Sequence, residues 1–216
     1  MRALLLLVVS LAFVAGCGGG GDDTTTESVA TSADGCTSVD APAPRDPDSL
    51  QAPTAALDAS KTYTLTFDTS CGSFTVTLDP ELAPKTTASL VALARAGYYD
   101  DTIFHRVVPG FVIQGGDPTQ SGSGGPGYTT VDVPPSDAAY TKGVVAMAKS
   151  GVEAPGTAGS QFFVVTGDDA GLPPEYAIVG KVTEGMDTVQ RINALGVADG
   201  PPSKPVVVTS VTVRES

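Results

Sequence analysis

Beyond position 62, the chain contains several short runs in which hydrophobic and polar side chains alternate. Two of these runs, 63–67 and 74–78, lie on either side of a turn at Cys71-Gly72. Successive side chains of a β-strand point to opposite faces of a sheet, so alternation predicts a half-buried strand. The two runs are therefore expected to form a β-hairpin.

Two other stretches have the spacing of helices. Pro84 lies in the first turn of a predicted helix that runs to Ala96, and Gly97 follows its end. Proline is tolerated at the start of a helix, and glycine is common just after its end. A second helix is predicted at about 185–195, where hydrophobic residues recur every three positions.

Further short strands complete the pattern. They are predicted at 144–147, 161–166, 177–182 and 206–213. Residues 115–136 are rich in glycine, proline and serine and are expected to form a long surface loop. Many short strands with only two helices indicate an antiparallel sheet that closes on itself.

The most informative pattern lies between Phe104 and Asp117, in the sequence FHRVVPGFVIQGGD. It predicts a strand, a tight turn and a second strand, and the alternation places Arg106 on the same face as Phe104. A guanidinium among hydrophobic rings is costly to desolvate unless acceptors satisfy its five donors. A structural ion pair is the ordinary explanation for an isolated arginine in a strand.

This run is not isolated, and it closely resembles the signature of the cyclophilins, a family of peptidyl-prolyl cis/trans isomerases. The resemblance spans about Tyr63 to Val213 and recurs in GVVAMA at 143–148, GSQFF at 159–163 and VGKV at 179–182. It implies a mainly β fold, the closed eight-stranded antiparallel barrel of the family with an α-helix capping each end. In the family, the arginine that matches Arg106 is the main catalytic side chain.

The resemblance also implies roles for the residues around Arg106. The residues that match the family's proline pocket, and are expected to line it here, are Phe111, Val112, Phe163 and Leu172. Val112 stands where the family usually has methionine. The peptide backbone is expected to be held by Gln114, Ala148, Lys149 and Gln161. Gln114 is also expected to orient the arginine.

Plainer explanations exist for several of these residues. Phe111 and Phe163 could be ordinary core residues, and Gln114 could be a strand residue with satisfied hydrogen bonds. His105, the single histidine, could be a general acid or base. The isomerisation needs no proton transfer, however, and the family places this residue at the rim of the site.

Three further residues depart from the family pattern. Lys149 stands where the family has asparagine, but contacts at this position come largely from the backbone. Gly171 replaces a tryptophan that is important for cyclosporin binding in many eukaryotic members, and Tyr176 replaces their histidine. We therefore expect weak cyclosporin binding and a more open pocket wall, one side of which the Tyr176 ring can still close.

The chemistry that this family performs suits an arginine and requires no cofactor or metal. Rotation about an Xaa–Pro bond meets a barrier of about 18–20 kcal/mol because the amide is stabilised by resonance. In the twisted amide the prolyl nitrogen regains a lone pair, which a fixed donor can stabilise. Arg106 can supply that donor because its guanidinium stays protonated. One histidine cannot build a typical zinc site.

The N-terminal 58 residues differ from the rest of the chain. Residues 1–16 combine one arginine with an apolar run and small residues, as expected for a secretory signal. The sequence VAGC at 14–17 resembles a bacterial lipobox, which implies lipid on Cys17; an ordinary signal is the alternative. Residues 17–58 carry eight acidic residues and one basic residue, and we expect them to form a flexible acidic tether. The isomerase domain would then cover 59–216.

The net charge bears on the possible partners of the chain, and the cysteines bear on its disulfide bonds. The net charge of −12 argues against nucleic acid as a partner. Export to an oxidising compartment favours a disulfide between Cys36 and Cys71, with free thiols or pairing between chains as alternatives. Such a disulfide would pin the second half of the tether against the domain.

Three hypotheses follow for the function. The first is an isomerase, acting as a monomer on Xaa-Pro segments of unfolded or exported proteins and anchored by lipid at the outer face of the cytoplasmic membrane of a bacterium. The second is a non-catalytic module that binds proline-containing peptides at the cell surface. The third is a purely structural surface protein, which predicts no binding of proline peptides.

Overall fold

The computed structural model describes residues 34–46 and 49–216. Cys17 and the predicted signal segment 1–16 lie outside the described residues. The described chain forms the following elements: β1 (Tyr63–Thr69), β2 (Gly72–Leu78), α1 (Pro84–Arg95), β3 (Thr102–Ile103), β4 (Arg106–Val108), β5 (Val112–Gly115), β6 (Thr130–Val131), β7 (Val144–Met147), β8 (Thr157–Ala158), β9 (Phe162–Val165), β10 (Ile178–Glu184), α2 (Met186–Ala194) and β11 (Val207–Glu215).

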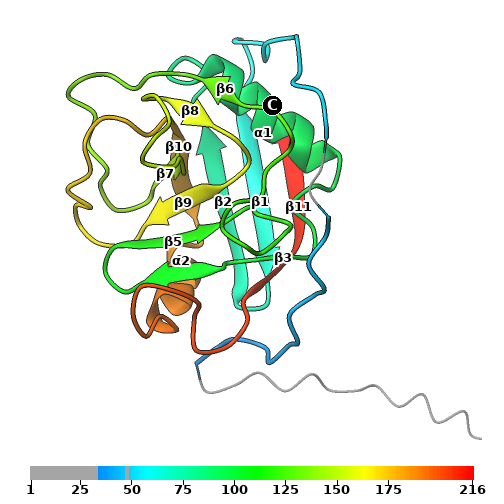
Figure 1. Ribbon diagram of the computed structural model, residues 1–216, viewed down its shortest axis with the longest axis vertical. Coiled ribbons are helices and arrows are strands. Elements are labelled where there is room, and N and C mark those ends of the chain that lie inside the picture. Colours follow the sequence, from blue (N-terminus) through cyan, green and yellow to red (C-terminus); the bar gives the residue numbers. More distant parts are fainter. Residues whose placement is uncertain (1–33, 47–48) are drawn as a thin grey trace, which may run out of the picture.

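One curled antiparallel sheet dominates the molecule (Figure 1). Its nine strands follow the order β3-β11-β1-β2-β10-β7-β9-β5-β4. The two outermost strands, β3 and β4, are separated in sequence only by Phe104 and His105, so the sheet must curl until its two edges come close together, although they do not pair. The predicted mainly β fold is confirmed. The sheet is a curled half-barrel of nine strands, where the sequence predicted a closed barrel of eight.

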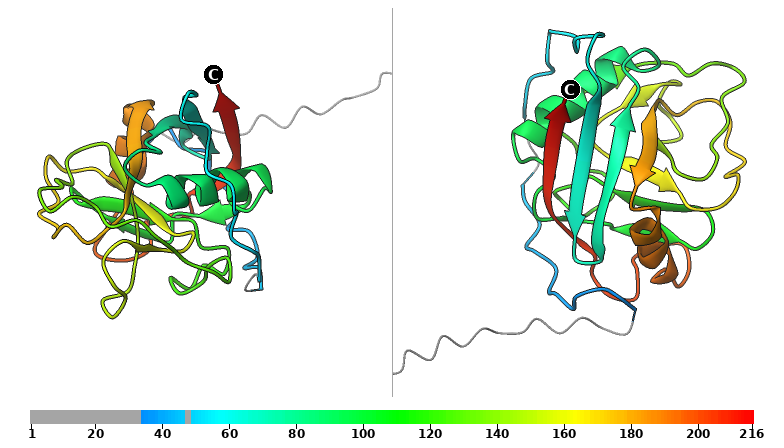
Figure 2. Two further views of the ribbon diagram at one scale, coloured as in Figure 1. Left: turned by 90° about the horizontal axis from the view of Figure 1, so that it is seen from above. Right: turned by 180° about the vertical axis from the view of Figure 1, so that it is seen from behind.

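The two predicted helices are confirmed as α1 and α2, and they lie at opposite ends of the sheet (Figures 1 and 2). Pro84 occupies the first turn of α1, and Gly97 follows its end with φ +68. Positive φ is a conformation that glycine adopts without steric cost. Neither α1, α2 nor any other helix of the described ranges is long and apolar enough to span a membrane.

Strands β5, β7 and β9 are buried on both faces. In β7, Val145 and Met147 belong to the main core inside the curl, whereas Val144 and Ala146 belong to a smaller hydrophobic cluster on the outer face. The same alternation continues in β9, where Phe162 faces the main core and Phe163 the outer cluster. This second cluster provides a rigid hydrophobic floor outside the sheet.

The prediction that Arg106 shares a face with Phe104 is wrong. Phe104 and Val107 are both completely buried in the main core, and Arg106 lies on the other face. The alternation fails because β3 ends at Ile103 and β4 begins at Arg106, which leaves a two-residue irregular link. The expected loop 115–136 also contains a strand, β6, which pairs with β8 in a separate two-stranded sheet.

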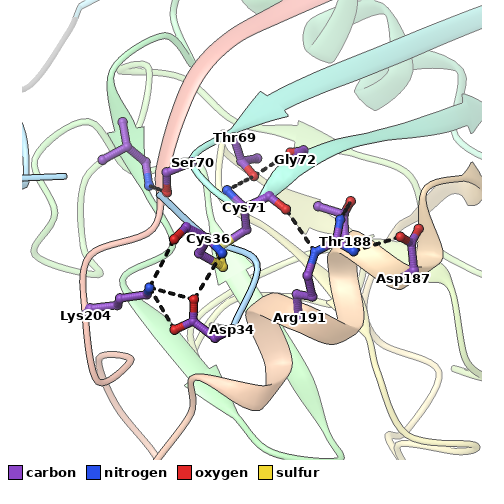
Figure 3. Close-up of a disulfide and its surroundings, with 11 residues drawn as sticks. Asp34, Cys36, Thr69, Ser70, Cys71, Gly72, Asp187, Thr188, Arg191 and Lys204 are labelled. Carbon is purple, nitrogen blue, oxygen red and sulfur yellow. Dashed lines mark hydrogen bonds and ion pairs between the residues drawn. A yellow bond between two sulfur atoms is a disulfide. The ribbon is translucent and has the colours of Figure 1, made fainter. Parts of the chain in front are cut away.

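Residues 34–46 and 49–58, here called the strap, run along the outside of the domain (Figures 1 and 2). At the end nearest α2, the fully buried Cys36 forms a disulfide with Cys71 in the turn between β1 and β2. Figure 3 shows Lys204 beside this disulfide, with its Nζ 2.7 Å from Asp34 Oδ2 and 3.4 Å from the Cys36 carbonyl oxygen. Arg191 Nε donates to the Cys71 carbonyl at 3.1 Å.

Farther along, the strap contacts the loop that follows β5. The Arg45 N–H donates to the Pro118 carbonyl at 3.0 Å, and the Leu50 N–H donates to the Pro126 carbonyl at 2.8 Å. Gln120 Nε2 donates to the Pro42 carbonyl at 2.8 Å. The expected disulfide between Cys36 and Cys71 is confirmed. As expected from it, the described residues of 17–58 are held against the domain, and backbone hydrogen bonds add to the disulfide, so these residues do not form a free coil.

Candidate active site

A small hollow of about 220 Å³ lies over the outer hydrophobic cluster, beside the turn between β4 and β5. Most of the residues singled out from the sequence meet here. They are Arg106, Phe111, Val112, Gln114, Ala148, Lys149, Phe163, Leu172 and Tyr176.

Strand register explains why residues so far apart in sequence converge. Arg106 in β4 lies directly opposite Gln114 in β5, and Gln114 lies opposite Phe163 in β9. Phe163 in turn pairs with Ala146 in β7. Directly opposed side chains on one face of a sheet are neighbours. Four consecutive strands thus carry a row that runs from the guanidinium to the hydrophobic cluster.

The Arg106 guanidinium is held by three hydrogen bonds. Its Nε and Nη2 donate to the two carboxylate oxygens of Asp199, at 2.5 and 3.0 Å, and its Nη1 donates to Gln114 Oε1 at 3.2 Å. The guanidinium carbon lies 5.9 Å from the centre of the Phe111 ring. Arg106 thus forms the ion pair expected of an arginine in a strand and also lines the hollow.

A chain of amide side chains links Arg106 to the neighbouring loop. Gln114 Nε2 donates to Gln161 Oε1 at 3.1 Å, and Gln161 Nε2 donates to the Gly124 carbonyl at 3.0 Å. Gln161 lies outside the small hollow and lines the adjacent groove. Because the amide of Gln114 donates to Gln161 and the amide of Gln161 donates to Gly124, the hydrogen bonds fix the orientation of both side chains.

Two aromatic rings, Phe163 and Tyr176, form one wall of the small hollow, and the buried Tyr140 ring packs against both. Phe163 and Tyr176 meet edge to face with centroids 5.6 Å apart, and Tyr140 stands edge to face on Tyr176 at 5.9 Å. The Tyr140 hydroxyl donates to the Tyr176 carbonyl at 2.7 Å and accepts from the Tyr176 N–H at 2.9 Å. Tyr140 therefore fixes the backbone that carries Tyr176, a role that no local sequence pattern indicates.

Lys149 contributes its stem rather than a free charge. Its side chain is 3% exposed, and its Nζ lies 3.0 Å from Glu175 Oε2. The ammonium also donates to the Glu153 carbonyl at 3.2 Å and lies 5.4 Å from the centre of the Tyr176 ring. The family's asparagine is therefore replaced here by a buried, paired lysine.

A larger groove of about 1020 Å³ adjoins the small hollow, and both are lined by Gln114, Ala148 and Lys149. The groove is also lined by the loop 119–129 and by Glu153 and Gln161. Although the groove is larger, Arg106 and the hydrophobic wall of Phe163 and Tyr176 line the small hollow. An extended peptide could occupy both at once.

Asp117 organises the groove loop. This buried carboxylate accepts hydrogen bonds from the Thr119 N–H at 2.8 Å, the Gly122 N–H at 2.7 Å and the Gly124 N–H at 3.1 Å. Burial alone would raise the pKa of Asp117, but these bonds and the Thr119 hydroxyl outweigh it and lower that pKa. A Cβ at position 124 would lie 2.0 Å from Asp117 Oδ1, so the close approach requires glycine.

His105 lies outside both hollows. Its two ring nitrogens are buried and have no hydrogen-bond partner among the described residues. Burial lowers the pKa of this imidazole. The nearby positive charge of Arg106 lowers the pKa further, whereas the negative charge of Asp117 acts to raise it. The His105 ring lies beside the groove loop, 3.9 Å from a Cβ placed at Gly122. An imidazole whose ring nitrogens are buried and whose pKa is lowered is unsuited to proton exchange with a substrate.

Sequence reasoning missed the partners that hold the site residues in place. Asp199, Tyr140 and Glu175 pair with Arg106, Tyr176 and Lys149, respectively. Asp199 is separated from Arg106 by 93 positions and lies in a turn-rich segment, so no local pattern could connect them. Within residues 34–46 and 49–216, no group of three or more His, Cys, Asp or Glu side chains could hold a metal ion.

Comparisons with known proteins agree with this geometry. Residues 64–213 match the family model described as cyclophilin type peptidyl-prolyl cis-trans isomerase/CLD. Peptidyl-prolyl cis-trans isomerase-like 1 of Emericella nidulans is 45% identical over 132 residues, which cover 59% of this chain and 80% of that protein. A probable peptidyl-prolyl cis-trans isomerase A of Mycobacterium leprae is 38% identical over 170 residues, covering 69% of this chain and 91% of that protein.

Solved structures show the same fold. A crystal structure of a cyclophilin type peptidyl-prolyl cis-trans isomerase from Cryptosporidium parvum has a TM-score of 0.65 and 31% identity, and the alignment covers 71% of this chain and 98% of that one. The same protein in the presence of the dipeptide Ala-Pro matches with a TM-score of 0.64, over 70% of this chain and 98% of that one.

Proposed function

Because this chain belongs to the cyclophilin-type peptidyl-prolyl cis-trans isomerases, we propose that Arg106 drives the isomerisation by stabilising the twisted Xaa–Pro amide without a covalent step. The observation that carries this proposal is the position of the guanidinium at the edge of a hydrophobic hollow of about 220 Å³. A proline ring fits the chemistry of such a hollow, and the guanidinium lies beside it.

The proposed mechanism depends on a difference in hydrogen bonding between the planar and the twisted amide. Resonance ties up the nitrogen lone pair in either planar isomer, and twisting releases it. An N–H of Arg106 aimed at the prolyl nitrogen therefore stabilises the twisted state more than either ground state, which is the requirement for catalysis. The pair of bonds to Asp199 and the bond to Gln114 keep the guanidinium in place while the amide turns.

The substrate is proposed to be an Xaa-Pro segment of an unfolded or exported protein. Phe163, Tyr176 and Leu172 provide the hydrophobic surface for the proline ring, and Gln114 and Gln161 offer amides to the backbone. The dipeptide Ala-Pro was present in one structure of the related Cryptosporidium protein, which supports the same class of ligand. Weak cyclosporin binding is part of the proposal, since nothing lies within 4 Å of a Cβ placed at Gly171.

An exchange assay on a short Ala-Pro peptide tests the role of Arg106 in the full chain. We expect Arg106→Ala to lower kcat/KM about 100-fold, as for the loss of one transition-state donor, with little change in peptide affinity. Arg95→Ala is the matched control, because Arg95 forms an exposed ion pair with Glu215 and does not line the small hollow or the groove. Equal rates for Arg106→Ala and the control would refute the proposed mechanism.

A non-catalytic module that grips proline peptides is the second candidate. It is favoured by one observation, the pairing of Arg106 with both oxygens of Asp199, which uses two of its donors. Under this alternative, the wild-type protein would bind the Ala-Pro peptide without raising its exchange rate. A titration and an exchange measurement on the same sample separate the two functions, and absence of binding would favour a purely structural protein.

The location is proposed to be the outer face of the cytoplasmic membrane of a bacterium, with a lipid on Cys17 as the anchor. The support is the VAGC sequence at 14–17 after an apolar segment and the disulfide between Cys36 and Cys71, a bond typical of oxidising compartments. Mass spectrometry of the intact protein from a bacterial host should show cleavage before Cys17 and added acyl mass. The Cys17→Ser variant should show neither, and an unmodified wild-type chain would refute the anchor.

A further inference from the structure

We propose that Asp199 is a positioning residue for the isomerisation, because its carboxylate fixes the orientation in which Arg106 presents its free N–H groups to the substrate. This inference rests on the role of Arg106 proposed above. Asp199 does not line the small hollow, so it acts through Arg106 rather than by contact with the peptide.

The geometry of the pair determines which donors stay available. Asp199 accepts from Nε and Nη2 and so occupies one whole edge of the planar guanidinium. Gln114 accepts one hydrogen of Nη1. A guanidinium has five N–H donors, so one hydrogen on Nη1 and one on Nη2 remain for a ligand. A two-point contact along one edge restricts rotation of the fork, which a single hydrogen bond does not do.

The position of Asp199 is itself fixed by the fold. The Val107 N–H, one residue after Arg106, donates to the carbonyl of Gly200, one residue after Asp199, at 2.8 Å. The same loop is closed by the Ser203 N–H, which donates to the Leu195 carbonyl at 2.8 Å. Farther along, Lys204 is held by Asp34 of the strap. Backbone bonds therefore keep the carboxylate beside Arg106 even before the two side chains pair.

Exposure decides how the pair responds to salt. The side chain of Asp199 is 65% exposed, and that of Arg106 is 31% exposed. The hydrogen bond from Arg106 lowers the pKa of Asp199, so the carboxylate is ionised at neutral pH. Exposed ion pairs are screened by salt. A role for Asp199 in positioning thus predicts a salt-dependent activity, which a purely structural role of the loop does not.

The test compares Asp199→Asn and Asp199→Ala with the wild-type full chain in the Ala-Pro exchange assay. Asparagine keeps one acceptor for the guanidinium and alanine keeps none. We therefore expect kcat to be highest for the wild type, lower for Asp199→Asn and lowest for Asp199→Ala. The fall should reach about tenfold for alanine, the scale of a lost orienting contact, with KM nearly unchanged. Raising the salt concentration should lower the wild-type kcat towards that of Asp199→Asn and leave both variants unaffected.

Asp187→Asn is the matched control. Asp187 also pairs with an arginine, Arg191, at 2.8 Å and is 73% exposed, but the pair lies on α2 and lines neither hollow. This variant should keep the wild-type rate and salt dependence. A double variant, Arg106→Ala with Asp199→Ala, should be no slower than Arg106→Ala alone, because Asp199 acts only through Arg106.

The outcomes separate this inference from the proposed function. If Arg106→Ala is slow and Asp199→Ala keeps the wild-type rate, the arginine mechanism holds and the positioning role of Asp199 is overturned. A higher kcat for Asp199→Ala also overturns it, because the carboxylate would then compete with the substrate for Arg106. If Arg106→Ala keeps full activity, the proposed mechanism fails first, and the inference fails with it.

Discussion

At the scale of single residues, the buried polar groups around the site differ in how many hydrogen-bond or ion-pair partners they have. Asp117 accepts several hydrogen bonds, Lys149 is buried with a carboxylate partner, and both ring nitrogens of His105 are buried without a described partner. A buried polar group without a hydrogen bond is costly, and a buried charge even more so. His105 and Lys149 therefore carry the clearest predictions at this scale.

We predict that His105 titrates below the ordinary value of 6.5. Burial disfavours the imidazolium, so the folded protein binds this proton less readily than the unfolded chain does. As the pH falls below 6.5, the unfolded state takes up the proton first, and stability should decrease. His105 is the single histidine, so one imidazole resonance in a proton NMR titration gives its pKa directly. A midpoint at or above 6.5 would contradict the buried, unpaired placement.

The second residue-scale prediction concerns Lys149. Lys149→Met keeps much of the apolar stem but removes the ammonium, which leaves Glu175 and the Glu153 carbonyl without this donor. Glu175 is 43% exposed and can be hydrated, so the expected loss of folding stability is about 1–2 kcal/mol rather than that of a fully buried pair. Urea unfolding measures it. Lys142→Met, which removes an exposed lysine 3.8 Å from Asp168, should leave the midpoint unchanged.

At the scale of elements, the groove depends on a loop with little regular structure. Thr119, Gly122 and Gly124 all direct N–H groups at Asp117, and the strap holds the same loop at Pro118 and Pro126. One wall of the groove is therefore supported from inside by a carboxylate and from outside by the strap. The opposite wall is built from strands that pack on the outer hydrophobic cluster.

We predict that Asp117→Asn loosens this loop. An amide supplies one acceptor oxygen where the carboxylate supplies two, so some of the loop N–H groups lose their partner, at about 1–3 kcal/mol. Hydrogen exchange at Gly122 and Gly124 should be slow in the wild type and fast in the variant. The pKa of Asp117 is lowered, so the wild-type protection should persist above pH 3.8 and disappear as the pH falls through that lowered pKa. Asp137→Asn, on an exposed part of the chain, should retain wild-type exchange.

Elements with a local pattern could be predicted from the sequence, whereas those fixed by distant contacts could not. In the helices and the longer strands, hydrophobic residues recur at a regular spacing, and these elements form close to the expected positions. Strands β3, β6 and β8 have two residues each, too few to show any period. The strap has few large hydrophobic residues, and its order comes from Cys71 and from carbonyls at Pro118 and Pro126.

The site shows the same division. Three of the four short segments of resemblance contain most of the residues of the small hollow, because strand register brings β4, β5, β7 and β9 together. Lys149, Leu172 and Tyr176 lie outside those segments. Asp199, Tyr140 and Glu175 act as partners of these residues, and each contact depends on the folded path of a loop. His105 is adjacent to Arg106 in sequence, yet it belongs to the irregular link before β4 and lines neither hollow.

At the scale of the whole molecule, the strap joins parts of the domain that are far apart in sequence. Its disulfide end contacts the turn after β1 and, through Asp34, Lys204 (Figure 3). Lys204 follows the loop that carries Asp199. Its other end contacts the groove loop at Pro118 and Pro126. One segment outside the family match at 64–213 thus touches both loops that border the candidate site.

We predict that removing the disulfide destabilises the domain. The bond joins residues 35 positions apart, and a loop of this size stabilises the folded state by about 2–4 kcal/mol through the entropy of the unfolded chain. The double variant Cys36→Ala, Cys71→Ala should therefore unfold at a lower urea concentration than the parent. Both proteins carry Cys17→Ser, so that no third thiol interferes.

A reductant provides the internal control for this comparison. It should shift the parent to the midpoint of the double variant and leave the double variant itself unchanged. The contacts of Lys204 with Asp34 and the Cys36 carbonyl depend on the strap staying in place, so loss of the disulfide should also lower kcat modestly. If parent and variant unfold at the same midpoint, the disulfide does not hold the strap against the domain, and the Asp199 loop is fixed by its own backbone bonds alone.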